Sequence, residues 1–174
     1  MSADEYEHDE ALEAEFVTVA DALLSDTVEL LAPRDPIKLG PEVTVDEAVA
    51  KMADHRRAAV VIVDGEGRLV GIFTERDVLT RVVRQRRDPR ETRLLEVMTP
   101  DPEALAPDDR ICHAVNRMHN AGYRTVPLVD AERRPVGIVT VNDVVTWLAE
   151  IFPEAVLNLR PGDKIKRPSQ IDAG

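Results

Sequence analysis

Cysteine is nearly absent from this sequence of 174 residues, in which Cys112 stands alone. A single cysteine excludes an intramolecular disulfide and a zinc site built on paired cysteines, and it is typical of proteins in a reducing compartment. Aromatic residues make up 3% of the chain, so the core must be built from Val, Ile, Leu, Ala and Met. We therefore expect a cytoplasmic protein with an aliphatic core.

Long apolar segments are missing as well. The longest apolar run, Ala58–Val63, is far shorter than the roughly 20 residues that span a bilayer. The N-terminal stretch MSADEYEHDEALEAEF is acidic and contains no basic region followed by an apolar one, so no signal peptide is evident. These absences predict that the protein has no membrane partner.

Basic residues are missing from one end of the chain. Residues 1–33 hold ten carboxylates and no Lys or Arg, whereas the remaining 141 residues hold 22 basic and 23 acidic groups. The formal net charge of −11 therefore belongs to an acidic N-terminal arm, assigned to residues 1–26, and the rest of the chain is nearly neutral. Because such an arm repels phosphates and stacking aromatics are scarce, we expect no nucleic-acid partner.

What the chain does contain is an internal repeat. The stretch GIFTERDVL (71–79) returns 66 residues later as GIVTVNDVV (137–145). An ungapped alignment of residues 35–84 with residues 101–150 contains 19 identities in 50 positions, and the identities fall in clusters. Clustered matches at one fixed period indicate a duplicated structural unit.

The boundaries of the repeat follow from this alignment and from a proline-interrupted, arginine-rich stretch between the copies. We assign the first repeat to residues 27–86, the linker to 87–93, the second repeat to 94–152 and a C-terminal tail to 153–174. The segments outside the repeats are too short for a second domain, so we expect no fused enzyme or transporter.

Both repeats contain the same order of predicted elements, β-α-β-β-α. In each, an extended stretch precedes an amphipathic helix, an apolar strand, a turn, a second strand and a closing helix. The expected ranges are Asp46–Asp54, Ala59–Val63, Leu69–Phe73 and Glu75–Arg86 in the first repeat, and Thr125–Val129, Val136–Val139 and Val141–Phe152 in the second. The first helix opens with Thr44-Val-Asp-Glu47, a capping-box pattern. We expect an α/β (α+β) fold in which the repeats pack sheet to sheet, because one copy alone is too small to bury much surface.

Two stretches carry a resemblance to a known family. VVIVDGEGRLVGIFTERDVL and TVPLVDAERRPVGIVTVNDVV each contain a strand ending in Val-Asp and then Gly-Ile-x-Thr-x-x-Asp, and they resemble the cystathionine-β-synthase-type (CBS) domain. The resemblance covers residues 27–152. It implies a tandem pair packed as a pseudo-two-fold sandwich with two clefts that take adenosyl ligands, a homodimer, and regulation of a separate partner protein.

The Thr-x-x-Asp of each repeat lies where a strand passes into a helix, and two interpretations of it stay open. Thr74 and Thr140 occupy N-cap positions, where a helix presents free N–H groups and partial positive charge to a phosphate. Asp77 and Asp143 follow three residues later, and a carboxylate can accept hydrogen bonds from both vicinal hydroxyls of a ribose. The same spacing is also close to a capping box, in which these side chains satisfy only backbone donors.

The resemblance implies further ligand contacts, with Arg76 and Lys38 near phosphate, Ile37 packed on the adenine, and Tyr123, Arg124 and Pro127 beside the base or a phosphate. The second repeat has Asn142 in place of Arg76, which weakens the charge there. Since each repeat departs from the family pattern at a different point, we expect the two clefts to be inequivalent.

These observations predict a regulatory sensor that binds an adenine nucleotide or related adenosyl ligand and signals to an unidentified partner. AMP, ADP and ATP come first as ligands, with NAD and S-adenosylmethionine also possible, and no cofactor is required. The alternative is a structural module that dimerises and whose clefts take no ligand. We do not expect an enzyme or a metal site, because the sequence contains no nucleophile–base constellation, glycine-rich phosphate loop or metal-ligand spacing.

Overall fold

The computed structural model describes residues 21–151. Most of the acidic arm assigned to residues 1–26, and the whole tail assigned to 153–174, therefore lie outside the described residues. None of the helices between residues 21 and 151 has the length and apolarity that crossing a membrane requires.

The first repeat forms the predicted order of elements. They are η1 (Val28–Leu31), β1 (Lys38–Leu39), α2 (Val45–Asp54), β2 (Ala59–Val63), β3 (Leu69–Thr74), α3 (Glu75–Asp77) and η2 (Val78–Val83). Helix α2 begins where Thr44 Oγ1 accepts a hydrogen bond from the N–H of Glu47 (3.3 Å), which forms one half of the predicted capping box. The helix buries Val45, Ala48 and Met52, whose spacing of three and four residues places them on one face.

The closing helix of the first repeat differs from the α-helix predicted for residues 75–86. After the single turn of α3 the chain continues as a π-helix, in which the N–H of Arg84 donates to the carbonyl of Leu79, five residues earlier (3.0 Å). The hydroxyl of Thr80 donates to the Arg76 carbonyl (2.7 Å), and such a side-chain bond competes with the regular helical ladder. The prediction of a helix is confirmed up to Val83, but the prediction that it is an α-helix is wrong beyond Asp77.

The second repeat contains the same order in a more regular form. Its elements are α4 (Leu94–Val97), β4 (Thr99–Pro100), α5 (Ile111–Asn120), β5 (Thr125–Val129), β6 (Pro135–Thr140) and α6 (Val141–Ile151). Gly122, at φ +68°, follows the C-cap residue Ala121 of α5, where a glycine in the left-handed conformation commonly ends a helix. The antiparallel β5–β6 hairpin has a register shift after Leu128, and β2–β3 has one after Ile62, the equivalent residue 66 positions earlier.

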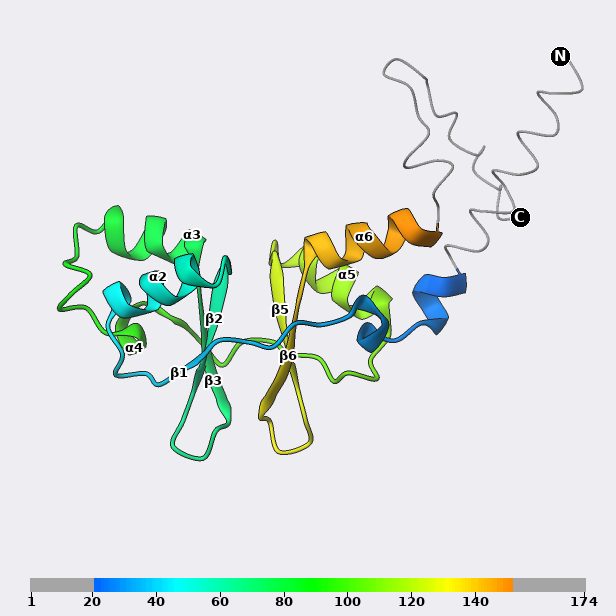
Figure 1. Ribbon diagram of the computed structural model, residues 1–174, viewed down its shortest axis with the longest axis horizontal. Coiled ribbons are helices and arrows are strands. Elements are labelled where there is room, and N and C mark those ends of the chain that lie inside the picture. Colours follow the sequence, from blue (N-terminus) through cyan, green and yellow to red (C-terminus); the bar gives the residue numbers. More distant parts are fainter. Residues whose placement is uncertain (1–20, 152–174) are drawn as a thin grey trace, which may run out of the picture.

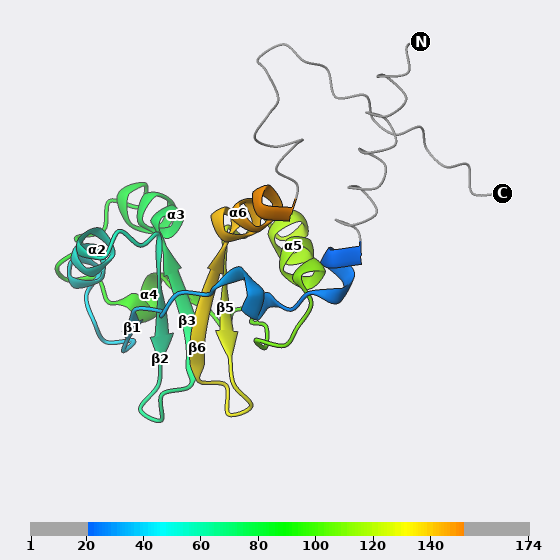
Figure 2. The same ribbon diagram turned by 45° about the vertical axis from the view of Figure 1, so that its right-hand side comes forward.

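The two hairpins lie next to each other at the centre of the molecule. Figures 1 and 2 show α2 and α3 outside one hairpin and α5 and α6 outside the other. Residues of both repeats meet in a buried cluster between the hairpins, which contains Ala59, Val61, Leu69, Ile72 and Ile138. The predicted packing of the two repeats around shared apolar surface is thereby confirmed.

Each repeat begins with a leader segment that packs on the other repeat. Val28 and Leu31 of η1 are buried in the core around α5 and α6, whereas Leu94 and Val97 of α4 are buried in the core around α2. After η1 the chain crosses from the second repeat to the first, and Figure 1 shows this crossing as the segment coloured from blue to cyan. On the way, Arg34 forms an antiparallel bridge with Ile138 of β6, just as β4 pairs with β3.

Candidate functional site

Both Thr-x-x-Asp segments form the predicted caps. In the first repeat the N–H and hydroxyl of Thr74 donate to Asp77 Oδ2 (2.9 and 2.7 Å), and the Asp77 N–H donates to Thr74 Oγ1 (3.4 Å). In the second repeat the N–H and hydroxyl of Thr140 donate to Asp143 Oδ2 (both 2.7 Å). The capping interpretation is therefore confirmed in full in the first repeat, and in the second repeat for the bond that the Thr140 N–H donates to Asp143. Each cap uses only the Oδ2 atom, and the remaining oxygen, Oδ1, determines what else each carboxylate can bind.

The Oδ1 atom of Asp77 is bound within the first repeat. Arg81 Nε lies 3.2 Å from it, one helical turn along the same helix. The same guanidinium donates through Nη1 to the carbonyl of Val97 (2.9 Å), in the leader segment of the second repeat. Asp77 thus has both oxygens in short polar contacts, and its arginine partner is itself held in place by α4.

The Oδ1 atom of Asp143 is held more loosely, and Asp143 lines a cavity. Its nearest cationic partner is Arg34 Nη2 at 3.8 Å, beyond hydrogen-bond distance, and the Arg34 side chain is 57% exposed. The side chains of Asp77 and Asp143 are 10% and 9% exposed, so burial does not distinguish the two carboxylates. They differ in how tightly the second oxygen is held.

A cavity of about 280 Å³ lies between the repeats at the start of β2 and the end of β6. Its charged lining comes from both repeats and comprises Arg34, Asp35, Arg56, Arg57, Glu75 and Arg124. Four arginines against two carboxylates leave a formal charge of +2. Thr140, Val141 and Asn142, at the N-terminus of the 11-residue helix α6, complete one wall, so helix N–H groups add to the positive potential.

A second cavity of about 250 Å³ lies on the far side of Arg34. Asp143, Trp147 and Glu150 of α6 line it, together with the leader residues 30–32 and 34. Arg34 lines both cavities, and Thr140 lines the larger and Asp143 the smaller one, so both cavities adjoin the Thr140–Asp143 cap. The two cavities and the free oxygen of Asp143 together form the candidate site.

The structure brings together only part of the predicted site. Ile37, Arg124 and Thr140 line the larger cavity and Asp143 lines the smaller one. The other predicted residues line neither of these two cavities: Thr74, Arg76, Asp77, Lys38, Tyr123 and Pro127. Lys38 is exposed in β1, and Pro127 lies within β5, opposite Ile138.

Arg34, Arg56 and Arg57 were not among the predicted site residues. Arg56 and Arg57 follow α2, and Arg34 lies in the leader, so nothing in the local pattern placed them beside Thr140 of the other repeat. A backbone signal exists, because Arg56 has a φ of +52° at the position where the second repeat has Gly122. A left-handed conformation costs a non-glycine residue roughly 1–2 kcal/mol. A charged side chain therefore lines the cavity at a site that favours glycine.

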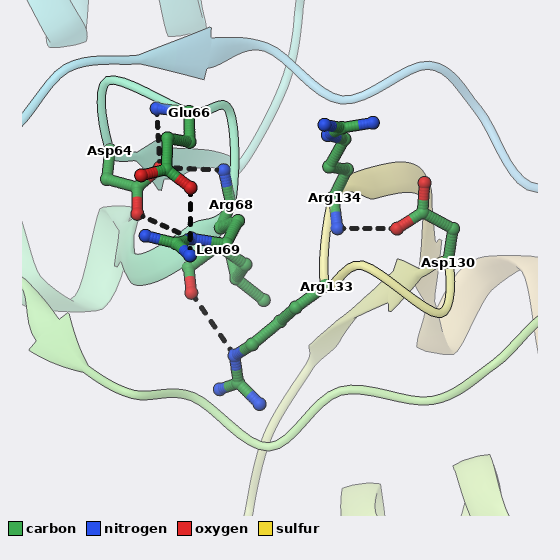
Figure 3. A network of polar contacts seen from close by, with 7 residues as sticks. All are labelled: Asp64, Glu66, Arg68, Leu69, Asp130, Arg133 and Arg134. Carbon is green, nitrogen blue, oxygen red and sulfur yellow. Dashed lines mark hydrogen bonds and ion pairs between the residues drawn. The ribbon is translucent and has the colours of Figure 1, made fainter.

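The opposite end of the hairpins is closed by polar contacts between their tips (Figure 3). Arg133 donates to the carbonyls of Leu69 (3.3 Å) and Pro102 (3.4 Å) and pairs with Asp101, while the Leu69 N–H donates to the Arg133 carbonyl (2.8 Å). Arg133 has a φ of +64° at the position of Gly67 in the first repeat. The repeats are thus joined at their tips, away from the cavity.

The turn of the first hairpin is also held by Asp64. Its carboxylate accepts hydrogen bonds from the N–H groups of Glu66 and Arg68 and from Arg68 Nε, each at 2.9 Å. The bond from the Arg68 backbone N–H, more than any other contact, holds the pKa of the Asp64 carboxyl below its usual value. In the second hairpin Asp130 accepts only the corresponding backbone bonds, from Glu132 (3.1 Å) and Arg134 (2.7 Å).

Comparison with known sequences finds the repeat independently. A family model described as the CBS domain matches residues 28–84 and again residues 94–150. An uncharacterized protein of Methanopyrus kandleri is 35% identical over 120 residues, which are 69% of this chain and 61% of that protein. A CBS domain-containing protein of Arabidopsis thaliana, CBSCBSPB3, is 29% identical over 164 residues but is matched over only 28% of its length. The chain thus spans less than two thirds of these relatives.

Solved structures match more completely. The CBS domain pair of protein MJ0100, in complex with 5′-methylthioadenosine and S-adenosyl-L-methionine, is 28% identical with a TM-score of 0.65, over 71% of this chain and 96% of that one. A putative signal-transduction protein with CBS domains from Burkholderia ambifaria MC40-6 is 26% identical with a TM-score of 0.65, over 71% and 93%.

Proposed function

The chain belongs to the CBS domain family, as a tandem pair of such domains, and on this premise we propose that it is a regulatory module that binds one class of adenosyl ligand beside α6 and relays ligand level to a partner protein. The resemblance read from the two Gly-Ile-x-Thr-x-x-Asp stretches is confirmed by the double match. The ligand, its residues and the partner are the proposal.

The observation that carries the proposal is the arginine-lined cavity next to a cap whose second oxygen is loosely held. The positive end of the α6 dipole, beside Thr140, favours a phosphate, and the four arginines continue that positive surface. Asp143 Oδ1, with its nearest cation 3.8 Å away, suits the ribose hydroxyls. Positive charge for a phosphate therefore lies beside a carboxylate for hydroxyl groups, and a nucleotide has its phosphate and its ribose in the same adjacent arrangement.

The charge of the cavity selects among adenosyl ligands. A formal +2 favours AMP, ADP, ATP or the pyrophosphate of NAD over the cationic sulfonium of S-adenosylmethionine. The MJ0100 pair, 28% identical, is described with 5′-methylthioadenosine and S-adenosyl-L-methionine, which share only the adenosine half with these nucleotides. We therefore propose a common adenosine site and a different, phosphate-bearing ligand.

The crossing leader offers a route from ligand to partner. Arg34 is bonded through its backbone to Ile138 and contributes its side chain to both cavities. A ligand that engages Arg34 and Thr140 together ties the leader of the first repeat to α6 of the second. It thereby stabilises one arrangement of the two repeats over others, which is how a ligand changes what a partner protein binds.

A structural dimerisation module is the second candidate, and exposed apolar side chains favour it. Leu79 and Val145, which are equivalent residues of the two repeats, are 64% and 52% exposed on the closing helices, and Val83 is 61% exposed. Side chains of this kind on neighbouring helices suit a second copy of the chain. In this function the arginine-lined cavity has no ligand.

The test is a parallel calorimetric titration of the full chain with AMP, ADP, ATP, NAD and S-adenosylmethionine. We expect micromolar binding of at least one phosphate-bearing ligand and loss of that binding in Asp143→Ala. Lys51→Ala, which changes an exposed residue of α2 outside both cavities, serves as the control and should bind as the wild type does. No heat from any of the five ligands would exclude the sensor and leave the dimerisation module.

A further inference from the structure

The first repeat offers its Thr-x-x-Asp to a ligand less readily than the second, and the cause is a side chain of the protein. Asp77 Oδ1, which corresponds to the loosely held oxygen of Asp143, is 3.2 Å from Arg81 Nε. A guanidinium–carboxylate contact of this length is an ion pair, held by the attraction between two opposite charges. A ribose hydroxyl is neutral and would have to replace it.

Arg81 is also anchored at its other end. Its Nη1 donates to the carbonyl of Val97 (2.9 Å) in the leader that packs on the first repeat. Displacing the guanidinium from Asp77 therefore disturbs the contact between the helix and this leader as well. In the second repeat the equivalent position holds Trp147, whose indole offers a single donor and carries no charge.

The leader residue that follows Val97 packs against the strand that leads to this cap. A Cβ atom on Gly71 of β3 would overlap the Sδ atom of Met98, so the methionine lies directly over the strand that leads to Thr74. At the equivalent Gly137 of β6 the nearest atom to such a Cβ is Cβ of Pro33, at 3.1 Å. A long side chain from the leader thus packs against Gly71, three residues before Thr74, whereas a short one packs against the equivalent Gly137.

We infer that Arg81 takes the place of a ligand at Asp77, that Arg81 and Met98 together close the first cleft, and that the chain binds one adenosyl ligand, at Asp143. This inference rests on the proposed function. It assigns opposite roles to two carboxylates that the sequence makes equivalent: Asp143 is a ligand-binding residue, and Asp77 is an internal partner of Arg81 that fixes the first repeat.

The stoichiometry of the full chain tests this directly. With the phosphate-bearing ligand that binds tightest, calorimetry should give one site per chain in the wild type and in Asp77→Ala, and none in Asp143→Ala. Trp147 is the single tryptophan of the chain and lines the cavity beside Asp143, so its fluorescence should change with the same midpoint as the heat. Melting curves of each variant establish that it is folded.

The outcomes separate the inference from the function it rests on. Two sites per wild-type chain, or one site that Asp77→Ala abolishes and Asp143→Ala keeps, would overturn the inference while leaving a nucleotide sensor. No binding of any of the five ligands would instead remove the proposed function itself.

A second experiment tests whether removing the two side chains creates a second binding site. Arg81→Met keeps the aliphatic stem and removes the guanidinium, and combining it with Met98→Ala removes the cover over Gly71. We expect the double variant, folded by its melting curve, to bind a second ligand that tryptophan fluorescence does not report. A double variant that still binds one ligand would refute the role of these two side chains in closing the cleft.

Discussion

The two repeats end their central hairpins in the same cap, and they use its carboxylate in different ways. Thr74 and Asp77 form the hydrogen bonds that Thr140 and Asp143 form, with distances that agree within 0.2 Å for the shared pairs (2.9 against 2.7 Å, and 2.7 Å in both). The second oxygen is held by Arg81 in the first repeat and more loosely in the second, where Asp143 lines a cavity. A local motif therefore specifies the cap, while residues elsewhere determine whether the cap is also a binding site.

The repeats also exchange glycine for arginine at two positions. The first repeat has Arg56 where the second has Gly122, and the second has Arg133 where the first has Gly67, all four at positive φ. In each case the arginine lies where the repeats meet, Arg56 at the cavity and Arg133 at the hairpin tips. Duplication kept the backbone conformation, and each copy acquired a charged side chain at a different end of the interface.

The largest difference between the repeats should appear in their cores. Phe73 and Val139 are equivalent residues in the two central strands, and both are fully buried. Phe73→Ala should lower the free energy of unfolding by about 3–5 kcal/mol, because it leaves a large cavity in a core with few other aromatics. Val139→Ala removes two carbons and should cost about 2 kcal/mol. Urea unfolding measures both, and equal losses would contradict the comparison.

A second experiment sharpens the comparison at the site. Arg124→Ala removes one charge from the cavity beside Thr140, and a hydrogen bond to a charged group is worth about 1.5–3 kcal/mol, so ligand affinity should fall about 10- to 100-fold. The matched control is Arg90→Ala in the exposed linker, which removes the same charge from the chain. Calorimetry should show no change for Arg90→Ala beyond about twofold; equal losses would mean that only net charge matters.

The glycine and arginine at the hairpin tips allow a smaller, matched test. Gly67 has a φ of +80° and open space around it, so Gly67→Ala should cost about 1 kcal/mol through backbone strain alone. Arg133→Gly relieves the same strain and removes partly exposed polar contacts of low value, so stability should stay within about 0.5 kcal/mol of the wild type. A loss in Arg133→Gly larger than in Gly67→Ala would show that the contact between the tips dominates.

The smallest expected effect is a pH dependence located in the first hairpin. The pKa of Asp64 is lowered in the folded protein by the N–H of Arg68, so its contribution to stability is present above the pKa of the unfolded chain, about 4. That contribution is lost as the pH falls through the lower, folded-state pKa. The free energy of unfolding, measured with urea at several pH values between about 6 and 3, should fall less steeply with decreasing pH in Asp64→Asn than in the wild type. Identical slopes would contradict this assignment.

Much of the fold could be predicted from the sequence because it depends on local patterns. The strands Ala59–Val63 and Thr125–Val129 have the predicted bounds, since an apolar run between turn residues is a strong signal. The π-helix after Asp77 could not be predicted, because Thr80 competes for a backbone carbonyl in the first repeat and the equivalent Thr146 lies in an ordinary α-helix. The same hydroxyl has different effects in different surroundings.

The site was predictable in its motif and not in its full composition. Thr140, Asp143, Arg124 and Ile37 line the two cavities, and each was identified on its own repeat. Arg34 and Arg56 were missed because their contribution depends on which repeat each segment lies against. The leader from residue 27 packs on the second repeat, so residues distant in the sequence share one cavity.

The sequence by itself determined the duplication, because its 66-residue period can be read from the aligned identities. It also determined the order of the elements and the two Thr-x-x-Asp caps, because these depend on the spacing of residues within about ten positions. Only the tertiary structure decided that the leaders cross between repeats, that Arg81 pairs with Asp77, and that Arg34 lies beside Asp143 at the wall of a cavity. These contacts depend on which surfaces are buried together. The hydrophobic effect is non-directional, so the spacing of residues along the chain does not specify the partner of a buried surface. Two nearly identical motifs can therefore carry different chemistry in one folded molecule.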